Sequence, residues 1–239
     1  MVYLEPIGDT HVGSFAFARD KLLDRIDEIK REKERIWIGM GDYLDNIRPW
    51  RRSRPDLRWE LSLLKGNPNW LEQWDDFVSM VKPIKDKCIG LLWGNHEFST
   101  FEEQEFERMV KKDLGVPFLG SRAFVILTVN GSGITKREWS ILAVHGDFSG
   151  DTKGGALNRM KQLSQTIVAN IYLYAHTHFK ATDKGERIYI RKNGNNVRIE
   201  REPTISVLTG GFIDPYYIGA DTYFDKKPRG RDIRVGTVT

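Results

Sequence analysis

The stretch Leu91–Phe98, LLWGNHEF, passes from an apolar run directly into a polar turn. The run CIGLLW at residues 88–93 predicts a buried strand, and Gly94 allows the chain to bend sharply where that strand ends. Asn95 and His96 follow at once, although neither residue type favours a strand. We therefore take this turn as a candidate functional site and compare it with the ends of the other predicted strands.

All five histidines of the chain lie at or just after the carboxyl end of a predicted strand. They are His11, His96, His145, His176 and His178. A lone histidine in such a place is more often a structural residue, but packing does not readily explain five of five. Ligands of open α/β sheets bind outside the carboxyl ends of the strands. The distribution predicts that the histidines converge on one edge of the molecule.

Strand and helix patterns alternate along the chain, which predicts an α/β fold. The expected strands cover residues 2–8, 35–42, 88–93, 123–130, 138–147, 170–178, 187–192, 196–200 and 204–211. The expected helices cover residues 19–34, 69–87, 100–113 and 154–168. We predict a single domain over residues 1–239, with a basic insertion at about 48–68 that is rich in Trp and Arg.

Composition is typical of a water-soluble globular protein. Hydrophobic residues make up 40% and charged residues 29%, and no apolar run reaches the ~18 residues that a membrane span requires. The amino-terminal sequence shows no basic and apolar signal regions, so we expect a cytoplasmic protein with no membrane partner. The net charge of +4 only weakly indicates an anionic partner, and Cys88 is expected in the core.

Carboxylate and amide side chains accompany the histidines at these strand ends. Asp9 stands two residues before His11, as His176 does before His178, and such positions point the same way in an extended chain. The further candidate ligands are Asp42, Asn95 and His145. Nitrogen and oxygen donors without a thiolate suit Mn, Fe or Zn.

These candidate ligands are too many for one ion once water is included, but they would fill two adjacent sites that share a carboxylate. Two metals about 3.5–4 Å apart stabilise the attacking and leaving oxygens in phosphoryl transfer. The ligand set therefore predicts hydrolysis of a phosphoester. Asp42 and Asp45 could instead be helix-capping or turn residues, and we expect Glu97 to support its loop.

Five short blocks of the sequence together resemble the calcineurin-like metallophosphoesterases. The blocks are Asp9-x-His11, Gly41-Asp42-x-x-Asp45, Gly94-Asn95-His96-Glu97, His145-Gly146-Asp147 and His176-Thr177-His178. The first block alone would be a weak signal, but the five in this order are specific. The resemblance implies a four-layer α-β-β-α sandwich with two mixed β-sheets and two divalent metal ions at the strand ends.

The resemblance also implies a role for each of these residues. The implied metal ligands form two sets, Asp9, His11 and His178 in one and Asn95, His145 and His176 in the other. Asp42 would bridge the ions, and a hydroxide held between them would attack phosphorus in line. His96 would act as general acid on the leaving oxygen, with Asp45 orienting its ring. Mn is the favoured metal, and Fe, Zn and Ni are alternatives.

The motifs leave the type of phosphoester open. GDYLDN and GNHE are close to the corresponding blocks of Ser/Thr protein phosphatases, which favours a phosphomonoester. However, Asn46 and Trp93 stand where that branch carries phosphate-binding arginines. The paired His176 and His178 are typical of phosphodiesterase and nuclease branches, although Ala175 replaces their usual glycine. The balance favours a phosphodiester.

The predicted insertion supplies candidate contacts to DNA or RNA, because arginines bind phosphates and tryptophans stack on bases. The candidate substrate-binding residues are Asn46, Arg48, Trp50, Arg51, Arg52 and Arg54. The alternative is a solvated basic loop whose tryptophans pack on the following helix.

The sequence thus predicts a binuclear phosphodiesterase acting on nucleic acid or a nucleotide. A protein or small-molecule phosphomonoesterase is the alternative, and a non-catalytic metal-binding scaffold for protein interaction is a more distant one. The sequence does not indicate an oligomeric state.

Overall fold

A computed structural model of the chain describes most of the residues. The described ranges are 2–14, 16–45, 69–130, 136–146, 152–194, 196–214 and 235–237. The predicted insertion at 48–68 lies outside them, so the single-domain organisation with this insertion stays a prediction.

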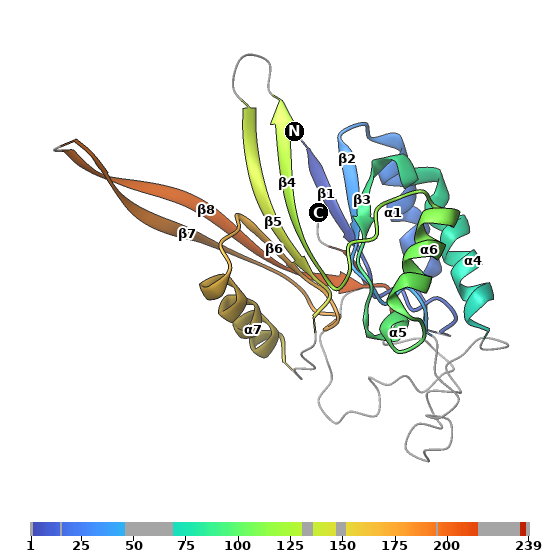
Figure 1. The fold of residues 1–239 in the computed structure, drawn as a ribbon. Coiled ribbons are helices and arrows are strands. Elements are labelled where there is room, and N and C mark those ends of the chain that lie inside the picture. Colours follow the sequence, from blue (N-terminus) through green and yellow to red (C-terminus); the bar gives the residue numbers. More distant parts are fainter. Residues whose placement is uncertain are drawn as a thin grey trace.

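The described strands form two sheets (Figure 1). The smaller sheet has the order β1-β2-β3, with β1 at Tyr3–Ile7, β2 at Arg35–Gly39 and β3 at Cys88–Leu91. The larger sheet has the order β4-β5-β6-β8-β7, and β9 pairs with β8. Its strands are β4 (Arg122–Asn130), β5 (Lys136–Val144), β6 (Ile171–Tyr174), β7 (Lys180–Asn193), β8 (Asn196–Gly211) and β9 (Gly236–Thr237).

The two sheets differ in strand direction. β4 and β5 form the predicted antiparallel hairpin, β5, β6 and β8 run parallel, and β7 returns antiparallel to β8. The larger sheet is therefore mixed, as expected. In the smaller sheet, β1, β2 and β3 all run parallel. The resemblance implies a mixed sheet here as well, so the structure differs from that expectation. Parallel pairing brings the carboxyl ends of its three strands to one edge.

Helices cover the outer faces of both sheets (Figure 1). The described helices are α1 (Arg19–Arg31), α4 (Trp70–Val81), the 3-10 helix η2 (Lys82–Lys87), α5 (Asn95–Phe98), α6 (Glu103–Asp113) and α7 (Lys153–Thr166). The side chains of α1, α4 and α6 pack on the smaller sheet, and those of α7 pack on the larger one. In α1 the apolar residues Leu22, Ile26 and Ile29 recur at helical spacing and are buried.

A separate apolar cluster joins the inner faces of the two sheets. Ile38 and Leu92 come from the smaller sheet and the residue after it, and Ala143, Leu173 and Val207 come from the larger sheet. With helices on the two outer faces, this cluster completes an α-β-β-α sandwich. The α/β fold class that the sequence predicts is confirmed.

One prediction about the strands is wrong. The sequence predicts separate strands at 196–200 and 204–211, but β8 runs unbroken through Pro203. β6 pairs only with residues 205–208 of β8, so at Pro203 the strand has β7 on one side alone. A proline is tolerated at such an edge because no second ladder needs its missing N–H.

None of the helices in the described ranges is long and apolar enough to cross a membrane.

Candidate metal centre

The candidate residues lie in the turns that follow five strands, drawn from both sheets. Asp9 and His11 follow β1, Asp42 follows β2, and Asn95 and His96 begin α5 after β3. His145 follows β5, and His176 and His178 follow β6. Contacts between the rings show that they meet, because the ring centroids of His11 and His178 are 5.1 Å apart and those of His145 and His176 are 5.3 Å apart.

The first predicted ligand set is brought together as a cluster. The ligand atoms of Asp9, His11 and His178 all lie within 4.8 Å of one another, and all three residues are buried. His178 Nε2 is 3.4 Å from Asp9 Oδ1. This spacing allows one ion to contact all three side chains.

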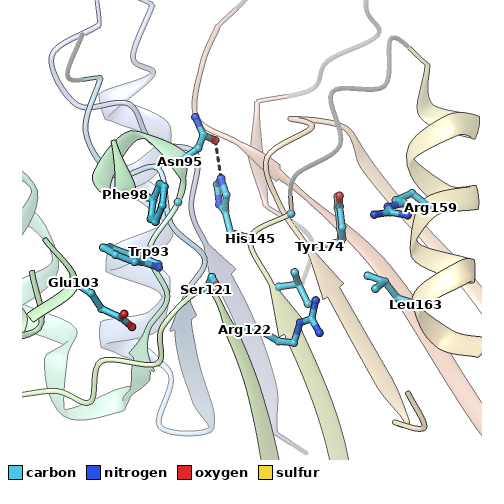
Figure 2. Close-up of a pocket in the computed structure, with 13 residues that line it drawn as sticks. Trp93, Asn95, Phe98, Glu103, Ser121, Arg122, His145, Arg159, Leu163 and Tyr174 are labelled. Carbon is cyan, nitrogen blue, oxygen red and sulfur yellow. Dashed lines mark hydrogen bonds between the residues drawn. The ribbon is translucent and has the colours of Figure 1, made fainter. Parts of the chain in front are cut away.

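The second predicted set forms a neighbouring cluster around Asp42. The ligand atoms of Asp42, His145 and His176 again lie within 4.8 Å of one another. Asn95 joins this cluster, because its Oδ1 is 3.3 Å from His145 Nε2 (Figure 2). The amide oxygen of Asn95 and the imidazoles of His145 and His176 thus lie on one side of the Asp42 carboxylate.

Asp42 lies between the two clusters. Its Oδ2 is 4.0 Å from His11 Nε2 in the first cluster and 3.2 Å from His145 Nε2 in the second. A carboxylate in this position can contribute to both sites, which is the geometry required of a bridging ligand.

Hydrogen bonds outside the clusters fix the orientation of the candidate ligands. His145 Nδ1 lies 2.7 Å from the Met40 carbonyl, so Nδ1–H can donate there while Nε2 faces Asn95. The backbone N–H of His176 donates to Asp9 Oδ2, and that of His96 donates to Asp42 Oδ1, both at 2.9 Å.

Asp45 makes a different contact from the predicted one. Its Oδ1 lies 3.1 Å from His11 Nδ1, whereas His96 Nδ1 has no hydrogen-bond partner among the described residues. The predicted hydrogen bond from Asp45 to His96 is therefore absent from this part of the structure. Asp45 orients His11 instead, because a proton on Nδ1 leaves the Nε2 lone pair pointing towards Asp42.

His96 packs against the first cluster. Its ring meets the ring of His11 edge to face, with centroids 4.6 Å apart, and it lies within 4.8 Å of ligand atoms of His11 and Asp42. Its side chain is only partly buried. His96 can therefore face a bound substrate from beside the clusters.

Glu97 holds the Asp42 loop against the turn after β3. This fully buried carboxylate accepts hydrogen bonds of 2.8–3.1 Å from the backbone N–H groups of Asp42, Tyr43, Leu44 and Gly94. The predicted supporting role of Glu97 is confirmed. Gly94 is required at this contact, because a Cβ there would lie 2.1 Å from Asp42 Oδ1.

The sequence argument for ligands at positions i and i+2 assumes an extended backbone. The backbone at these candidate ligands is not extended. Positive φ angles occur at five of them, namely Asp9, His11, Asp42, His176 and His178, with values from 47° to 67°. Non-glycine residues rarely adopt this left-handed conformation, and clusters of such residues mark functional sites. The paired ligands meet because the turns are left-handed, and not because a strand places them on one face.

The pKa values reflect burial among charged neighbours. Burial, together with the neighbouring His96, lowers the pKa of His11 to about 3. Burial also disfavours the charged form of His145, but the charge of Asp42 outweighs it and raises the pKa of His145 to about 10. Burial raises the pKa of Asp45 to about 7.

These residues fit a pair of divalent ions. His11 is neutral at pH 7, and its buried Nε2 has no hydrogen-bond partner among the described residues, so its lone pair is available to a cation. Carboxylate, amide and imidazole donors suit Mn, Fe, Zn or Ni, so the donor set does not choose the metal.

Comparison with known proteins agrees with this geometry. The family model of the calcineurin-like phosphoesterases matches residues 7–210. The chain belongs to this family. A structure of a conserved uncharacterized protein from Streptococcus pneumoniae TIGR4, described as a predicted phosphoesterase, aligns at 15% identity with a TM-score of 0.36. The alignment covers 90% of this phosphoesterase and 75% of that chain, and a similarity of this size adds nothing to the assignment. No curated protein matches the chain.

A pocket of about 460 Å³ opens beside Asn95 and His145 of the phosphoesterase (Figure 2). Trp93, Phe98 and Glu103 line one side of it, and Tyr174, Leu163 and Arg159 line the other. Ser121, Arg122, Val144 and the two glycines Gly94 and Gly146 complete the lining. The pocket therefore combines aromatic surface with two guanidinium groups next to the candidate metal centre.

The sequence does not single out these pocket residues as substrate contacts. Phe98 offers a weak signal, since it directly follows the GNHE block, and the structure shows its side chain to be 66% exposed. Arg122 and Arg159 offer none, because the packing of β4 and α7 brings them to the pocket. The substrate residues that the sequence predicts, Asn46, Arg48, Trp50, Arg51, Arg52 and Arg54, lie outside the described ranges, as does Asp147.

Proposed function

We propose that this phosphoesterase uses two divalent metal ions to hydrolyse a phosphodiester of a nucleotide or nucleic acid. The main support is the position of Asp42 between two clusters of imidazole and carboxylate groups. A site for a single ion would not need a second cluster beyond the shared carboxylate.

In this proposal Asp9, His11 and His178 would hold one ion, Asn95, His145 and His176 would hold the other, and Asp42 would contribute to both sites. When bound, the two ions supply an acidified water as nucleophile and stabilise charge on the attacking and leaving oxygens. Mn is our first choice of metal, as in the prediction from sequence.

His96 acts as the general acid. As water oxygen bonds to phosphorus and the bond from phosphorus to the leaving oxygen breaks, a proton moves from the His96 imidazole to that oxygen. The backbone bond from His96 to Asp42 and the contact with the His11 ring support this role, because they fix His96 beside both clusters. Asp45 acts as a positioning residue for His11.

The pocket beside Asn95 supports a diester with a nucleoside substituent. The Phe98 ring is 66% exposed and rests edge to face on the buried Trp93, with centroids 5.3 Å apart, and an exposed aromatic ring of this kind stacks on bases. Arg122 and Arg159 provide positive charge for a neighbouring phosphate. A phosphomonoester with a small leaving group would leave this pocket unused.

The test is a paired assay of the Mn-loaded protein on bis(4-nitrophenyl) phosphate and 4-nitrophenyl phosphate. We expect kcat/KM for the diester to exceed that for the monoester by at least about tenfold, a difference of about 1.4 kcal/mol in the barrier. The Asp42→Asn variant is the control for activity that does not come from this site. A preference for the monoester would refute the diester assignment, and no turnover of either ester would refute catalysis.

A further inference from the structure

The β7–β8 hairpin extends well beyond the rest of the larger sheet (Figure 1). β7 and β8 pair without a break from Lys180–Thr209 to Asn193–Asn196, whereas β6 contacts β8 only at residues 205–208. We call the projecting part of this hairpin, residues 186–203, the arm. A two-stranded ribbon has no sheet neighbour to bury its side chains.

One face of the arm is apolar and exposed. Ile188 and Ile190 of β7 and Val197 and Ile199 of β8 are 59%, 77%, 65% and 64% exposed. Side chains alternate along a strand, and Ile190 pairs directly with Ile199, so all four lie on the same face. Four β-branched residues grouped in this way indicate an interaction surface, unlike scattered exposed residues.

This face continues the core between the two sheets. Val207, which lies in the apolar cluster between the sheets, shares the face by alternation along β8. The smaller sheet covers Val207, which is 7% exposed, but does not reach Ile199. Among the described residues none covers Ile199 well, and it is 64% exposed. A partner would therefore extend an apolar layer that already exists.

The opposite face of the arm is polar, and its arginines already have partners. Arg191 and Arg198 both contact Glu200, at 2.6 and 2.8 Å. Arg187 donates to the Tyr172 hydroxyl and to the Ala169 carbonyl, which ties the base of the arm to the sheet. Because these guanidinium groups have partners, the arm is not an open basic ribbon of the kind that binds nucleic acid.

The apolar face is complementary to itself. Its β7 positions run Glu186, Ile188, Ile190 and Lys192, which places a carboxylate and an ammonium group at equal distances from the midpoint. A two-fold axis across the arm at this midpoint would stack the two arms face to face with their β7 strands antiparallel. Glu186, whose carboxylate also accepts from Arg201 of the same arm at 2.9 Å, would then face Lys192 of the second copy, and Ile188 would face Ile190.

The β8 positions fit the same axis. Ile199 would face Arg201 of the second copy, whose methylene groups can cover it, and Val197 would face Pro203. From this agreement of charge and shape we propose that the arm is the interface of a homodimer, with the two ribbons packed like the sheets of a sandwich.

The test measures the mass of the full-length protein by analytical ultracentrifugation across a concentration series. We expect a dimer for the natural sequence. The Ile190→Lys variant should weaken dimerisation by at least about 100-fold, because each dimer contains this position twice and loses both apolar contacts. Circular dichroism verifies that the variant folds, as expected for so exposed a position.

Two further variants separate this arrangement from other dimers. Ile126→Lys is the matched control, because Ile126 is also an exposed strand isoleucine, at 62%, but lies on β4 away from the arm. This variant should dimerise like the natural sequence. Lys192→Glu should weaken the dimer by about tenfold. Adding Glu186→Lys should recover part of that loss, since the pair between the copies is restored with opposite sign although the pair of Arg201 with Glu186 within each arm is lost.

A monomer at every concentration would overturn the proposal and point to a different protein as the partner of the arm. A dimer that survives Ile190→Lys would overturn it as well, because the interface would then lie elsewhere. Phosphodiester turnover is not needed for either measurement, so the outcome is independent of the proposed reaction.

Discussion

At the scale of single residues, a change at His96 distinguishes a catalytic site from one that only binds metal. His96 lies beside both clusters but belongs to neither predicted ligand set. We expect His96→Ala to keep both metal ions and to lose a factor on the order of 10²–10⁴ in kcat, the usual contribution of a general acid. Elemental analysis of the purified variant and its kcat on a diester are the two measurements. Unchanged turnover would contradict the assigned role, and loss of metal would indicate that His96 is a ligand.

Asp45 allows a test of the contact that the structure shows against the one that the sequence predicts. Because Asp45 holds His11 at 3.1 Å, we expect Asp45→Ala to weaken Mn²⁺ binding by about 10–100-fold, as for other residues that orient a metal ligand. Calorimetric titration with Mn²⁺ measures this change. Excess metal should restore most of the activity. If activity stays low at saturating Mn²⁺ while the affinity is normal, Asp45 acts on His96 after all.

His145 makes metal binding dependent on pH. Its pKa of about 10 means that the imidazole is protonated at pH 7 in the metal-free protein, and the proton must leave before Nε2 can bind a cation. We expect the apparent affinity for Mn²⁺ to rise by up to about tenfold per pH unit between pH 7 and 9. Calorimetry in buffers of different ionisation enthalpy should show proton release on binding. An affinity that does not vary with pH would contradict the raised pKa.

The same pKa fixes the sign of the stability change in the metal-free protein. The folded pKa of about 10 lies above the ordinary value of 6.5, so His145 binds its proton more tightly when folded. The stabilisation from its pairing with Asp42 is therefore fully present below pH 6.5 and is lost as the pH rises through about 10.

At the scale of elements, Glu97 joins the loop after β2 to the start of α5. Removing its carboxylate leaves four buried N–H groups without their acceptor, and one unsatisfied buried donor costs about 1–3 kcal/mol. We expect Glu97→Ala to lower the free energy of unfolding by about 3 kcal/mol or more. Urea denaturation measures the loss, and Glu103→Ala on the exposed start of α6 is the control. Equal effects of the two variants would contradict the anchoring role.

Most elements can be predicted from the sequence because their apolar residues recur with a clear period. The helical spacing of Leu22, Ile26 and Ile29 and the short buried run at β3 are examples. The length of the β7–β8 hairpin could not be predicted, because alternation looks the same whether the apolar residues are covered or exposed. Pro203 likewise signals a break unless the number of neighbouring strands is known.

The convergence of the candidate ligands could be predicted because parallel strands end at a common edge, so residues after strand ends come together. The partner of Asp45 could not, since it depends on the direction of the ring nitrogens of His11, a residue 34 positions away in sequence. The pocket could not be predicted either, because Trp93, which follows β3, and Arg159 of α7 line the same pocket only when the two sheets are packed together.

At the scale of the whole molecule, the candidate metal centre ties together turns from both sheets. Asp9 contacts His178 across the two sheets, and Asp42 contacts His145 in the same way. Ions bound here would hold the sheets to each other, and a ligand that binds only the folded state stabilises it. We expect removal of metal by a chelator to lower the melting temperature by several degrees. Calorimetry of the metal-free protein, before and after Mn²⁺ is restored, measures the shift, and a melting temperature that does not respond to metal would contradict it.

The left-handed turns at five candidate ligands also bear on how this sequence can change. Each such residue other than glycine costs about 1–2 kcal/mol relative to a relaxed backbone, and glycine would relieve that cost. Selection for thermal stability alone would therefore favour glycine at Asp9, His11, Asp42, His176 and His178, and would erase the site. The phosphoesterase therefore carries side chains at these positions that its own backbone disfavours, as expected of a site built for function at some cost in stability.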